Sequence, residues 1–447
     1  MARPGRRLDR HVGAFMVTDF KGRVLMVAYH YPPMRGSSGI QRTLKFSQYL
    51  PQHGWQPLVL SAHPRAYANS GDDQVAEIPP EAIVHRAFAL DTSRHLSLRG
   101  RYLGWMALPD RWVSWCLGAI PAGLRLIRHH KPQVIWTTYP IASAKVIGLV
   151  LHRLTGLPWI ADLRDPMTDV DYPNDPLTRR VYRWIEAQTV KHCTLAVCTT
   201  PGAIVTYTRR FPQIPASRFA LIENGYDEEN FANAAALLQP AVPLAGRPFT
   251  LVHSGVIYPS ERDPIPLFEA LAELRAAGTV TAARLRIVLR ATAHDEYLGG
   301  LIAKYGIGDI VSLAPHVAYR DALAEMLNAD GLLVLQATNC NHQIPAKLYE
   351  YLRARRPILA LTDATGDTAS ALRQAGIDTI APLDDKAGIQ AGLLCFLQLA
   401  EAGQAPLASP EAIAANSRRA RTAELARLLE QVTVTVPNAL KGTSEAC

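Results

Sequence analysis

The chain has 447 residues, which is too long for one ordinary core, so we expect two domains of roughly 200 residues each. Its six cysteines are scattered and include no Cys-x-x-Cys pair, which argues against a disulfide framework and against a zinc ribbon. The formal net charge of +8 favours an anionic partner, such as a nucleotide, a phospholipid or a nucleic acid, without choosing among them.

The first residues do not resemble an export signal. The basic stretch 1–10 is followed by an apolar piece, 13–17, that is shorter than the roughly 7 to 15 residues of an exported segment. No uncharged apolar stretch approaches the ~20 residues that a helix needs to cross a bilayer. We therefore expect a cytoplasmic protein, unless it lies on a surface.

The first half of the chain has the pattern of an α/β domain. Residues 1–22 show no clear period and are interpreted as a basic N-terminal arm. Over residues 23–232 short apolar runs alternate with amphipathic stretches, and the strand-like runs are 24–29, 58–63, 134–139, 159–164 and 194–200. Strands separated by helices imply helical crossovers and a mostly parallel sheet. We predict a Rossmann-like N-terminal domain over 23–232.

The second half repeats this pattern after a linker. Residues 232–248 lose periodicity and contain three prolines, so we place the linker at 233–247. A second α/β domain follows over 248–396, with helices expected at 265–277 and 319–328 and strands at 249–255, 285–291, 310–315, 331–337, 357–362 and 378–383. Two doubly wound domains in tandem can face a central cleft, and ligands bind at their strand ends.

The end of the chain has a different pattern. Residues 397–432 are predicted to form a C-terminal helical segment, in which 409–432 is an amphipathic helix with Ala, Leu and Arg at helical spacing. Residues 433–447 are predicted to be a disordered tail. No repeat of 20 to 50 residues and no low-complexity tract interrupts the two domains.

A glycine-bearing loop follows the first predicted strand. It contains Arg35, Gly36, Ser37, Ser38 and Gly39, and a helix is expected to begin near residue 40. The loop lacks the third glycine of a dinucleotide fingerprint. It is either a tight turn or a loop that contacts a phosphate or a sugar, and the flanking arginines at 35 and 42 favour the second interpretation.

A similar arrangement occurs in the second half. Gly255 follows a predicted strand, and Arg262 lies just before a predicted helix. An arginine at that place suits bidentate binding of a diphosphate, although a solvated arginine would have the same pattern. Arg290, at the end of the strand 285–291, is a further candidate for a donor contact.

The segment "NCNHQIPAKLYEYLRARRPILAL" at 339–361 predicts a helix over 344–353 with its N-terminus at the cleft. Lys347 and Glu350 are three positions apart and therefore share a face. The carboxylate suits the two hydroxyls of a ribose, and the lysine suits a phosphate. The same two residues would also form an ordinary intrahelical ion pair.

Several of these stretches, taken in order, resemble a known family. The stretches "VLMVAYHYPPMRGSSGIQRTLKFSQYLPQHGW", "GLPWIADLRDP", "IENGYD", "HSGVIYPSER" and "IPAKLYEYLRARRPILAL" are similar to those of bacterial glycosyltransferases of family 4, which have the GT-B fold. The resemblance covers roughly residues 22–432. It implies retaining, metal-independent transfer of a sugar from a nucleotide diphosphate sugar held by the C-terminal domain to an acceptor on the N-terminal domain. No cofactor is implied.

The resemblance also implies roles for single residues. Gly255 corresponds to the family's glycine after the first strand of the donor domain, Arg262 to its diphosphate-binding residue, and Glu350 to the second carboxylate of its Glu, seven residues, Glu signature. The first carboxylate is replaced by His342, so His342 or Gln343 is the candidate for the donor-sugar contact. We therefore name Arg262, Lys347 and Glu350 as the expected catalytic set.

No metal site is expected. The donor half has no Asp-x-Asp motif, and the pair Asp169 and Asp171 in the N-terminal half is interpreted as part of a solvated loop. Without a metal, Arg262, Lys347 and helix N-termini would stabilise the leaving diphosphate.

On the acceptor side, Asp162, Arg164 and Asp165 follow a predicted strand. Their carboxylates would orient an acceptor hydroxyl, or Asp162 and Arg164 would fix the loop by pairing. His30, directly after the first strand, is a weaker candidate. Cys193 and Cys198 are expected to be core thiols.

A basic segment bears on the partner. Residues 94–131 contain seven Lys or Arg and one acidic residue, with Trp105, Trp112 and Trp115 interleaved. This composition suits a helix that lies in an anionic membrane interface, or a helix with core tryptophans and a solvated basic face. Nucleic acid is disfavoured because no reading motif accompanies the charge.

The sequence leaves three hypotheses. The first is a glycosyltransferase that acts on a lipid-linked or polysaccharide acceptor at the inner face of the plasma membrane, in cell-surface polysaccharide biosynthesis. The second is a nucleotide-sugar 2-epimerase, which shares the two-domain fold. The third is a non-catalytic nucleotide-sugar-binding protein, which the histidine at position 342 makes plausible. Conversion of the donor without an acceptor separates the second from the first.

Overall fold

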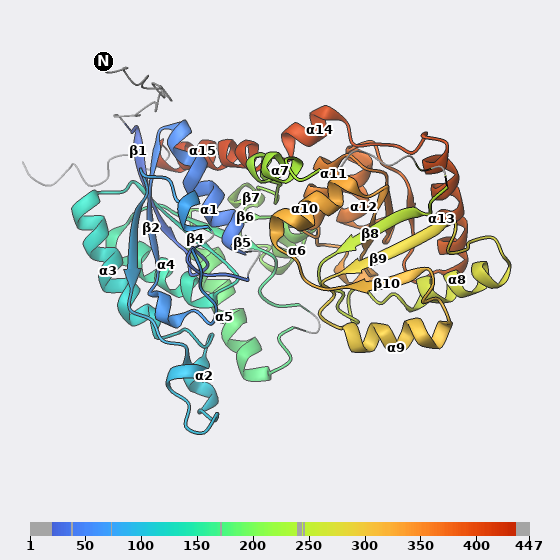
Figure 1. Cartoon of the computed structure of the whole chain (residues 1–447). Coiled ribbons are helices and arrows are strands. Elements are labelled where there is room, and N and C mark those ends of the chain that lie inside the picture. The colour runs from blue at the N-terminus through green and yellow to red at the C-terminus, as the bar shows by residue number, and fades with distance from the viewer. Residues whose placement is uncertain are drawn as a thin grey trace, which may run out of the picture.

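The computed structural model describes residues 20–36, 39–72, 74–169, 172–238, 244 and 246–434, and the statements below refer to these residues. The chain forms two α/β halves side by side, each with a sheet covered by helices (Figure 1). Most of the predicted N-terminal arm, Ser37 and Ser38, and most of the predicted tail lie outside the described residues.

The N-terminal half contains a parallel seven-stranded sheet in the order β3-β2-β1-β4-β5-β6-β7. The strands are β1 (Gly22–Val27), β2 (Trp55–Ala62), β3 (Ile83–Ala87), β4 (Val134–Thr138), β5 (Trp159–Arg164), β6 (Leu195–Cys198) and β7 (Phe219–Leu221). All five strands predicted in this half are present. The sequence missed the two edge strands, since β3 is mostly half-exposed and β7 has three residues, so neither forms a long apolar run.

The helices of this half connect consecutive strands. They are α1 (Gly39–Tyr49), α2 (Thr92–His95), α3 (Trp115–His130), α4 (Ala142–Thr155), α5 (Pro176–His192), α6 (Pro201–Arg210) and α7 (Glu228–Ala235). The basic segment 94–131 is not one helix, because an irregular stretch separates α2 from α3. Trp115, the first residue of α3, is fully buried.

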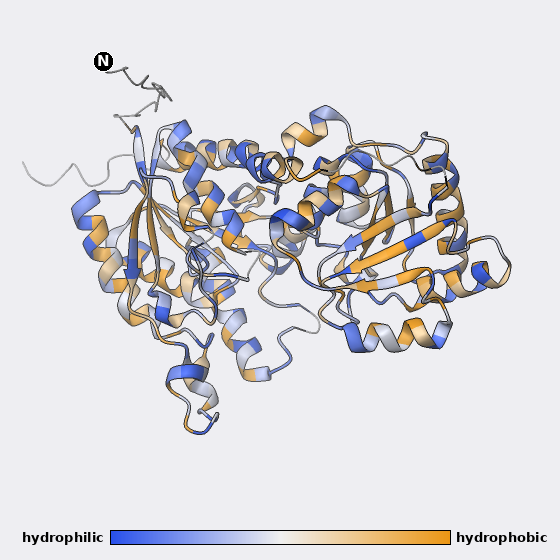
Figure 2. Cartoon of the chain, viewed as in Figure 1, coloured by the Kyte–Doolittle hydropathy of each residue, from blue (hydrophilic) through white to orange (hydrophobic). Residues whose placement is uncertain are grey.

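The C-terminal half contains a parallel six-stranded sheet in the order β10-β9-β8-β11-β12-β13. Its strands are β8 (Phe249–Ser254), β9 (Leu285–Arg290), β10 (Val311–Ala314), β11 (Gly331–Leu335), β12 (Ile358–Leu361) and β13 (Ile380–Ala381). All six were predicted. The strands read as apolar stretches because helices cover both faces of the sheet, and Figure 2 shows them as mostly hydrophobic.

The remaining helices are α8 (Ile265–Ala276), α9 (Asp295–Tyr305), α10 (Tyr319–Asn328), α11 (Lys347–Ala354), α12 (Asp367–Gln374), α13 (Lys386–Glu401), α14 (Pro410–Ala415) and α15 (Arg418–Val434). The helix predicted at 344–353 begins three residues later, after Pro345. The helix predicted at 409–432 is two helices, α14 and α15, that meet at Asn416 and Ser417.

Two segments cross between the halves, which the predicted domain boundaries did not anticipate. Phe231 and Ala234 of α7 belong to a core cluster built mainly by the C-terminal half. Leu425 and Leu429 of α15 instead pack in a cluster with β1 and other strands of the N-terminal half. The last helix therefore completes the first domain, and the chain passes twice from one domain to the other.

None of the helices in the described part of the chain has both the length and the apolar character needed to span a bilayer.

Candidate functional site

Both sheets have a point where the strand order reverses, between β1 and β4 and between β8 and β11. Ligands of doubly wound sheets bind outside the carboxyl ends of strands at such points. Gly255 directly follows β8, and His30 lies three residues after β1. The structure therefore places one loop from each domain where a ligand is expected.

Gly255 needs to be a glycine for two reasons. Its φ of +104° is unfavourable for other residues. A Cβ at this position would also lie 3.3 Å from Nζ of Lys347. The backbone of the loop and the lysine are therefore in close contact, as two of the predicted donor-site residues should be.

Lys347 is the first residue of α11, and its Nζ lies 2.9 Å from Nε2 of His253. His253 is fully buried, and its Nδ1 lies 2.9 Å from the carbonyl oxygen of Leu333. Burial, and then the charge of Lys347, lower the pKa of His253 well below its usual value, so the ring is neutral. A neutral ring whose Nδ1–H donates to Leu333 leaves Nε2 to accept from the lysine.

The ammonium group of Lys347 is poorly solvated. Burial lowers its pKa well below the usual value, and the positive charge of Arg262 lowers it further. An anion arriving here would relieve both effects. His253 was missed by the sequence reading, although a histidine inside the apolar run "FTLVHSG" was a usable signal.

Arg262 lies in the loop between β8 and α8, with a side chain that is 13% exposed. Its Nη1 donates to the carbonyl oxygen of Val256 at 3.0 Å, and its guanidinium lies 5.5 Å from the ring centre of Tyr258. The nearest carboxylate in the described residues, that of Glu261, is 4.0 Å away. The guanidinium is thus fixed in place without a close carboxylate partner.

Glu350 lies one turn along α11 from Lys347. It accepts a hydrogen bond of 2.6 Å from the hydroxyl of Tyr319, and burial raises its pKa despite this bond. No ion pair joins it to Lys347 among the described residues, so the intrahelical pair considered from the sequence is absent. The structure brings together Gly255, Arg262, Lys347 and Glu350 on the cleft side of the C-terminal domain.

Arg290 is arranged differently from the prediction. Its Nη2 and Nε lie 2.5 and 2.8 Å from the two carboxylate oxygens of Glu325 on α10, and its Nη1 donates to the carbonyl oxygen of Pro315. The guanidinium of Arg290 therefore has its partners within the C-terminal domain. The prediction that Arg290 contacts the donor is not supported by this arrangement.

His342 contacts the other domain. Its Nε2 lies 2.9 Å from Oδ2 of Asp169, and its carbonyl oxygen accepts from the hydroxyl of Thr200 at 2.6 Å. The Asp169 side chain is 38% exposed, so it is partly solvated while it contacts His342, and Asp171 lies outside the described residues. The backbone carbonyl oxygen of Gln343 accepts a hydrogen bond of 3.0 Å from the hydroxyl of Thr368.

A second contact between the domains lies beside the first. The N–H of Gly202, near the start of α6, donates to Oδ2 of Asp367 at 2.7 Å. A Cβ at Gly202 would lie 2.8 Å from Cα of His342, so only a glycine allows this approach. The domains are in direct contact at the end of the loop that carries His342.

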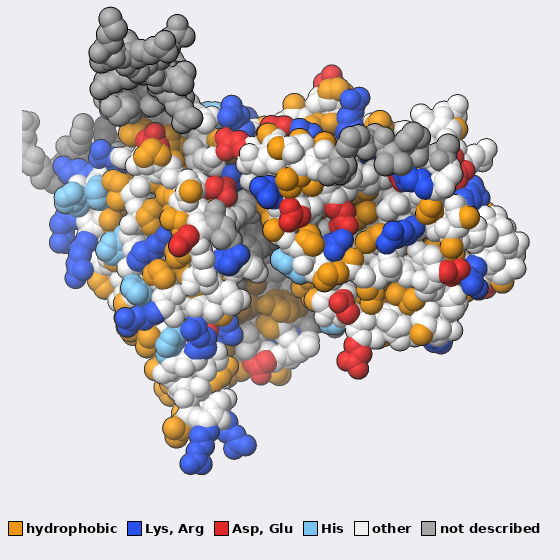
Figure 3. Space-filling model, viewed as in Figure 1, with side chains coloured by type: hydrophobic (Ala, Val, Ile, Leu, Met, Phe, Trp, Pro, Cys, Tyr) orange, Lys and Arg blue, Asp and Glu red, His pale blue; other side chains and the backbone are white. Residues whose placement is uncertain are grey.

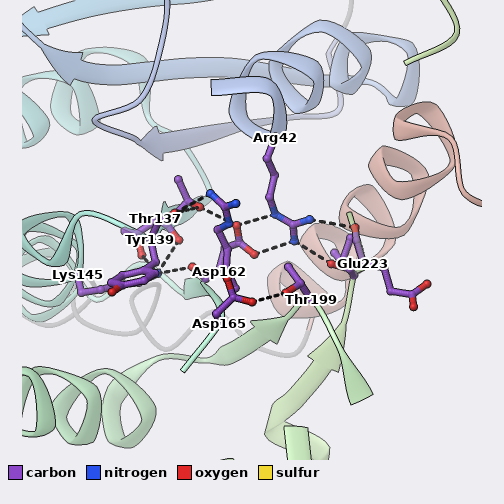
Figure 4. A network of polar contacts seen from close by, with 11 residues as sticks. Arg42, Thr137, Tyr139, Lys145, Asp162, Asp165, Thr199 and Glu223 are labelled. Atoms are coloured by element: carbon purple, nitrogen blue, oxygen red, sulfur yellow. Dashed lines mark hydrogen bonds and ion pairs between the residues drawn. The ribbon is translucent and has the colours of Figure 1, made fainter. Parts of the chain in front are cut away.

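Asp162 is part of the core of the N-terminal domain (Figure 4). Its carboxylate accepts from Nε and Nη2 of Arg42 at 2.9 and 2.8 Å and from Thr138 at 2.7 Å. Burial opposes ionisation, but Arg42 outweighs it and lowers the pKa of Asp162. Two predictions are corrected: Asp162 is too buried to orient an acceptor, and it pairs with Arg42 rather than Arg164.

Arg42 is likewise 2% exposed, so it does not contact a ligand from the glycine loop. Beside it, the sequence reading missed Lys145, whose Nζ donates to the carbonyl oxygens of Asp162 at 2.7 Å and Thr137 at 3.0 Å. Burial lowers the pKa of Lys145 to about 7. These groups fix the ends of β4 and β5.

The other predicted acceptor-side residues lie at the carboxyl ends of β1 and β5. Arg164 has a φ of +60° at a bulge in β5, and its Nη1 donates to Tyr139 at 3.3 Å. Asp165 accepts from the hydroxyl of Thr199 at 3.3 Å. Burial, and then the charge of Arg164, lower the pKa of His30 to about 4, so its ring is neutral at pH 7.

The described part of the glycine loop borders this region. Gly36 has a φ of +80°, and Gly39 is the first residue of α1. The backbone N–H of Arg35 donates to Asn69 at 3.1 Å. The turn interpretation accounts for Gly36, and nothing in these contacts identifies a ligand.

A separate cavity of about 580 Å³ lies in the N-terminal domain, beside α5 and α6. Its lining includes three arginines, and Arg210 among them pairs with the fully buried Glu186 at 2.5 Å. Asp169 also lines it, so the cavity adjoins the loop that reaches His342. None of the predicted site residues lines it.

Two parallel α/β domains with ligand loops at facing strand ends define a GT-B fold. Sucrose-phosphate synthase from Thermosynechococcus elongatus is similar with a TM-score of 0.62 and 15% identity, over 93% of this chain and 100% of that chain. Alr3699/HepE from Anabaena, solved with UDP, has a TM-score of 0.61 and 13% identity over 92% and 100%. A trehalose-phosphate synthase from Burkholderia vietnamiensis has 0.63 and 11% over 93% and 100%.

The sequence family is visible in the first domain. Residues 38–225 match the model of the glycosyl transferase 4-like domain, so this part of the chain is similar to that family. No curated protein sequence matches the chain. The predicted fold and family are confirmed, whereas the roles of individual residues remain predictions.

Proposed function

We propose that the chain is a glycosyltransferase that moves a sugar from a nucleotide diphosphate sugar to a lipid-linked or polysaccharide acceptor, with retention and without a metal ion. The observation that carries this proposal is the group formed by Gly255, Arg262 and Lys347. It combines an open backbone with two cations that have no close carboxylate partner among the described residues. Such a group suits a diphosphate.

The donor would lie across the carboxyl end of β8. Arg262 and Lys347 would hold the diphosphate, and Glu350 would accept hydrogen bonds from the ribose hydroxyls. In the reaction the bond between the anomeric carbon and the diphosphate oxygen breaks, and the acceptor oxygen bonds to that carbon. The acceptor proton passes to the departing diphosphate. Lys347 would then stabilise the charge that develops on the leaving group.

The acceptor would bind to the N-terminal domain at the ends of β1 and β5. Arg164 lies close enough to His30 for its charge to lower the pKa of that ring, and with Asp165 these residues make the strand ends polar, which suits a sugar hydroxyl. His342 stands where the resemblance implies a carboxylate, and its contact with Asp169 ties this position to the first domain. We infer that His342 and the carboxylate of Asp169 together form the donor-sugar side of the cleft.

The proposal is tested by following both products in a panel of nucleotide sugars. Release of nucleoside diphosphate that requires an acceptor supports the transferase. Conversion of the donor without an acceptor supports the 2-epimerase instead, and binding without turnover across the acceptor panel supports a binding protein. Arg262→Ala should lower the signal by roughly tenfold or more at limiting donor, whereas Arg286→Ala, on an exposed position of β9, is the matched control.

A further inference from the structure

A projection extends from the N-terminal domain between β3 and α3. It comprises residues 91–111, includes α2, and reaches beyond the rest of this domain at the bottom of the view (Figure 1). The projection leaves from the carboxyl end of β3. It therefore starts from the same edge of the sheet as the loops that face the cleft.

The base of the projection is well held. Asp91 is fully buried, caps α2 through the N–H of Ser93 at 3.0 Å, and lies 3.3 Å from Nε of Arg111. The N–H of Thr92 donates to the carbonyl oxygen of Arg111 at 2.8 Å, and its hydroxyl donates to that of Met106 at 3.0 Å. The two ends of the projection are thus joined, and the tip has a defined position.

The tip is a tight turn. Leu98 and Arg101 exchange backbone hydrogen bonds of 2.8 and 3.0 Å. The two central residues, Arg99 and Gly100, have φ of +53° and +77°, which is the conformation of a type I′ turn. The four residues of this turn are all exposed.

The tip exposes large apolar side chains. Every residue from 98 to 105 is exposed, and Leu98, Leu103 and Trp105 reach 81%, 61% and 67%. These side chains lie within eight residues of the chain, at the turn and directly after it, unlike the scattered exposed apolar residues that are normal on a protein surface. Contact with water alone does not explain this group of exposed apolar side chains.

The tip is also basic. No acidic residue occurs between Asp91 and Asp110, and both of these are held at the base. Neither Arg99 nor Arg101 has a carboxylate partner in the described part of the chain. Figure 3 shows Lys or Arg side chains at the lowest point of the molecule, with hydrophobic ones beside them.

We propose that this tip, residues 96–105, inserts into the interface of a bilayer that contains anionic phospholipid. Arginines contact lipid phosphates, tryptophan and tyrosine favour the headgroup region, and the leucines enter the acyl boundary. For the basic segment 94–131 the sequence left open a membrane-interface helix or a helix with core tryptophans, and Trp115 at the start of α3 is in the core, so α3 is not the docking element. The proposal deepens the proposed function, because it favours a lipid-linked acceptor delivered to the cleft edge of the first domain.

The test is flotation of the full chain with vesicles of phosphatidylcholine alone or mixed with phosphatidylglycerol, in the absence of donor and acceptor. Wild type should float with the mixed vesicles, less so at high salt. Arg99→Gln with Arg101→Gln should weaken partitioning roughly 30-fold, at about 1 kcal/mol for each arginine. Trp105→Ser with Leu103→Ser should weaken it with little change in salt dependence.

Matched controls lie at the opposite edge of the sheet. Arg125→Gln with Arg128→Gln removes the same charge from exposed positions near the end of α3, and Leu154→Ser removes an exposed leucine at the end of α4. These variants should float like wild type.

If the tip variants and the control variants weaken flotation equally, the proposal is wrong. If wild type floats equally well with neutral vesicles, the electrostatic part of the proposal is wrong. If the tip variants instead lose self-association in sedimentation without any change in flotation, the tip binds a second copy and the proposal is wrong. Thermal unfolding checks that each variant is folded. If the variant with Trp105→Ser does not fold, the variant with Arg99→Gln and Arg101→Gln still tests the proposal. Turnover on a soluble acceptor analogue should be unchanged in every tip variant, so failure of the membrane proposal is distinguishable from failure of the transferase proposal.

Discussion

Arg262, the residue proposed to hold the diphosphate, is fixed in its loop without a close carboxylate partner among the described residues. Its carbonyl contact with Val256 and its position over Tyr258 fix the guanidinium, while the nearest described carboxylate stays 4.0 Å away. A guanidinium held in this way loses little conformational freedom when a ligand binds. Binding of a donor diphosphate should therefore cost little side-chain entropy at Arg262.

We predict that Arg262→Ala raises the dissociation constant of the donor tenfold or more, because a hydrogen bond to a charged group contributes about 1.5 to 3 kcal/mol. Isothermal titration with the nucleotide sugar identified by screening measures this change. Arg286→Ala should bind as wild type does. A folded Arg262→Ala variant with unchanged affinity would remove this residue from the site.

Lys145 provides a second prediction, which concerns pH. Its pKa is about 7 in the folded chain, against 10.5 when unfolded, so between these values the unfolded chain binds more protons. The free energy of unfolding should then rise with pH above 7, by up to ~1.4 kcal/mol per unit, relative to a Lys145→Met variant. Below pH 7 both states are protonated and this contribution is flat.

Chemical denaturation at pH 7, 8 and 9 measures the difference between the two proteins. Lys191→Met, which removes an exposed lysine on α5, should run parallel to wild type across this range. If the curve of Lys145→Met is also parallel to wild type, the buried ammonium has no unusual pKa.

The predicted donor-site residues that the structure brings together are those that lie close together in the chain. Gly255 and Arg262 share one loop, and Lys347 and Glu350 share one helix, so local spacing was enough to group them. The pair of Arg42 and Asp162 is separated by 120 positions. Nothing in a single sequence marks such a pair, and both residues were therefore assigned to ligand contacts that their burial excludes.

Among the elements, α15 shows best why domain boundaries cannot be read from composition. Its pattern of Ala, Leu and Arg predicted a helix, and the helix is present. Periodicity does not say which core an amphipathic helix covers. Its apolar face packs in the cluster of β1, so the last helix of the chain stabilises the first domain.

We predict that Leu429→Ala, at a fully buried position of α15, destabilises the N-terminal domain by about 2 to 5 kcal/mol. Hydrogen exchange should accelerate at the amides of β1, although the substitution lies some 400 residues away in the chain, and change less at β8. Arg427→Ala, on the exposed face of the same helix, is the control. Faster exchange only in the C-terminal domain would show that α15 belongs there.

The strands at the edges of the first sheet show a second limit of sequence-based prediction. The central strands are apolar throughout because helices cover both faces, and all of them were predicted. β3 is largely half-exposed and pairs with one neighbour only, so its sequence carries no distinctive period. The edge strands β10 and β13 of the second sheet were predicted, so edge position alone does not remove the signal, and β3 lacks it because its residues are mostly half-exposed.

The proposed site is shared by the two domains, because neither carries all of its predicted residues. The donor group lies on the C-terminal domain, and His30, Arg164 and Asp165 lie on the first. Contacts from Thr200 and Gly202 hold the loop of His342 against α6. The proposed site therefore depends on the relative position of the domains, and α7 and α15 cross between these domains.

The most direct test of the whole account is the rate of nucleoside diphosphate release, with donor and acceptor at saturation, in excess EDTA. If Arg262, Lys347 and the helix N-termini stabilise the leaving diphosphate, wild type keeps its activity in EDTA. Lys347→Ala then lowers the turnover number more than it weakens donor binding, since its interaction strengthens as charge develops. Activity that is lost in EDTA and returns with magnesium or manganese, or a Lys347→Ala variant with normal turnover, would contradict the account.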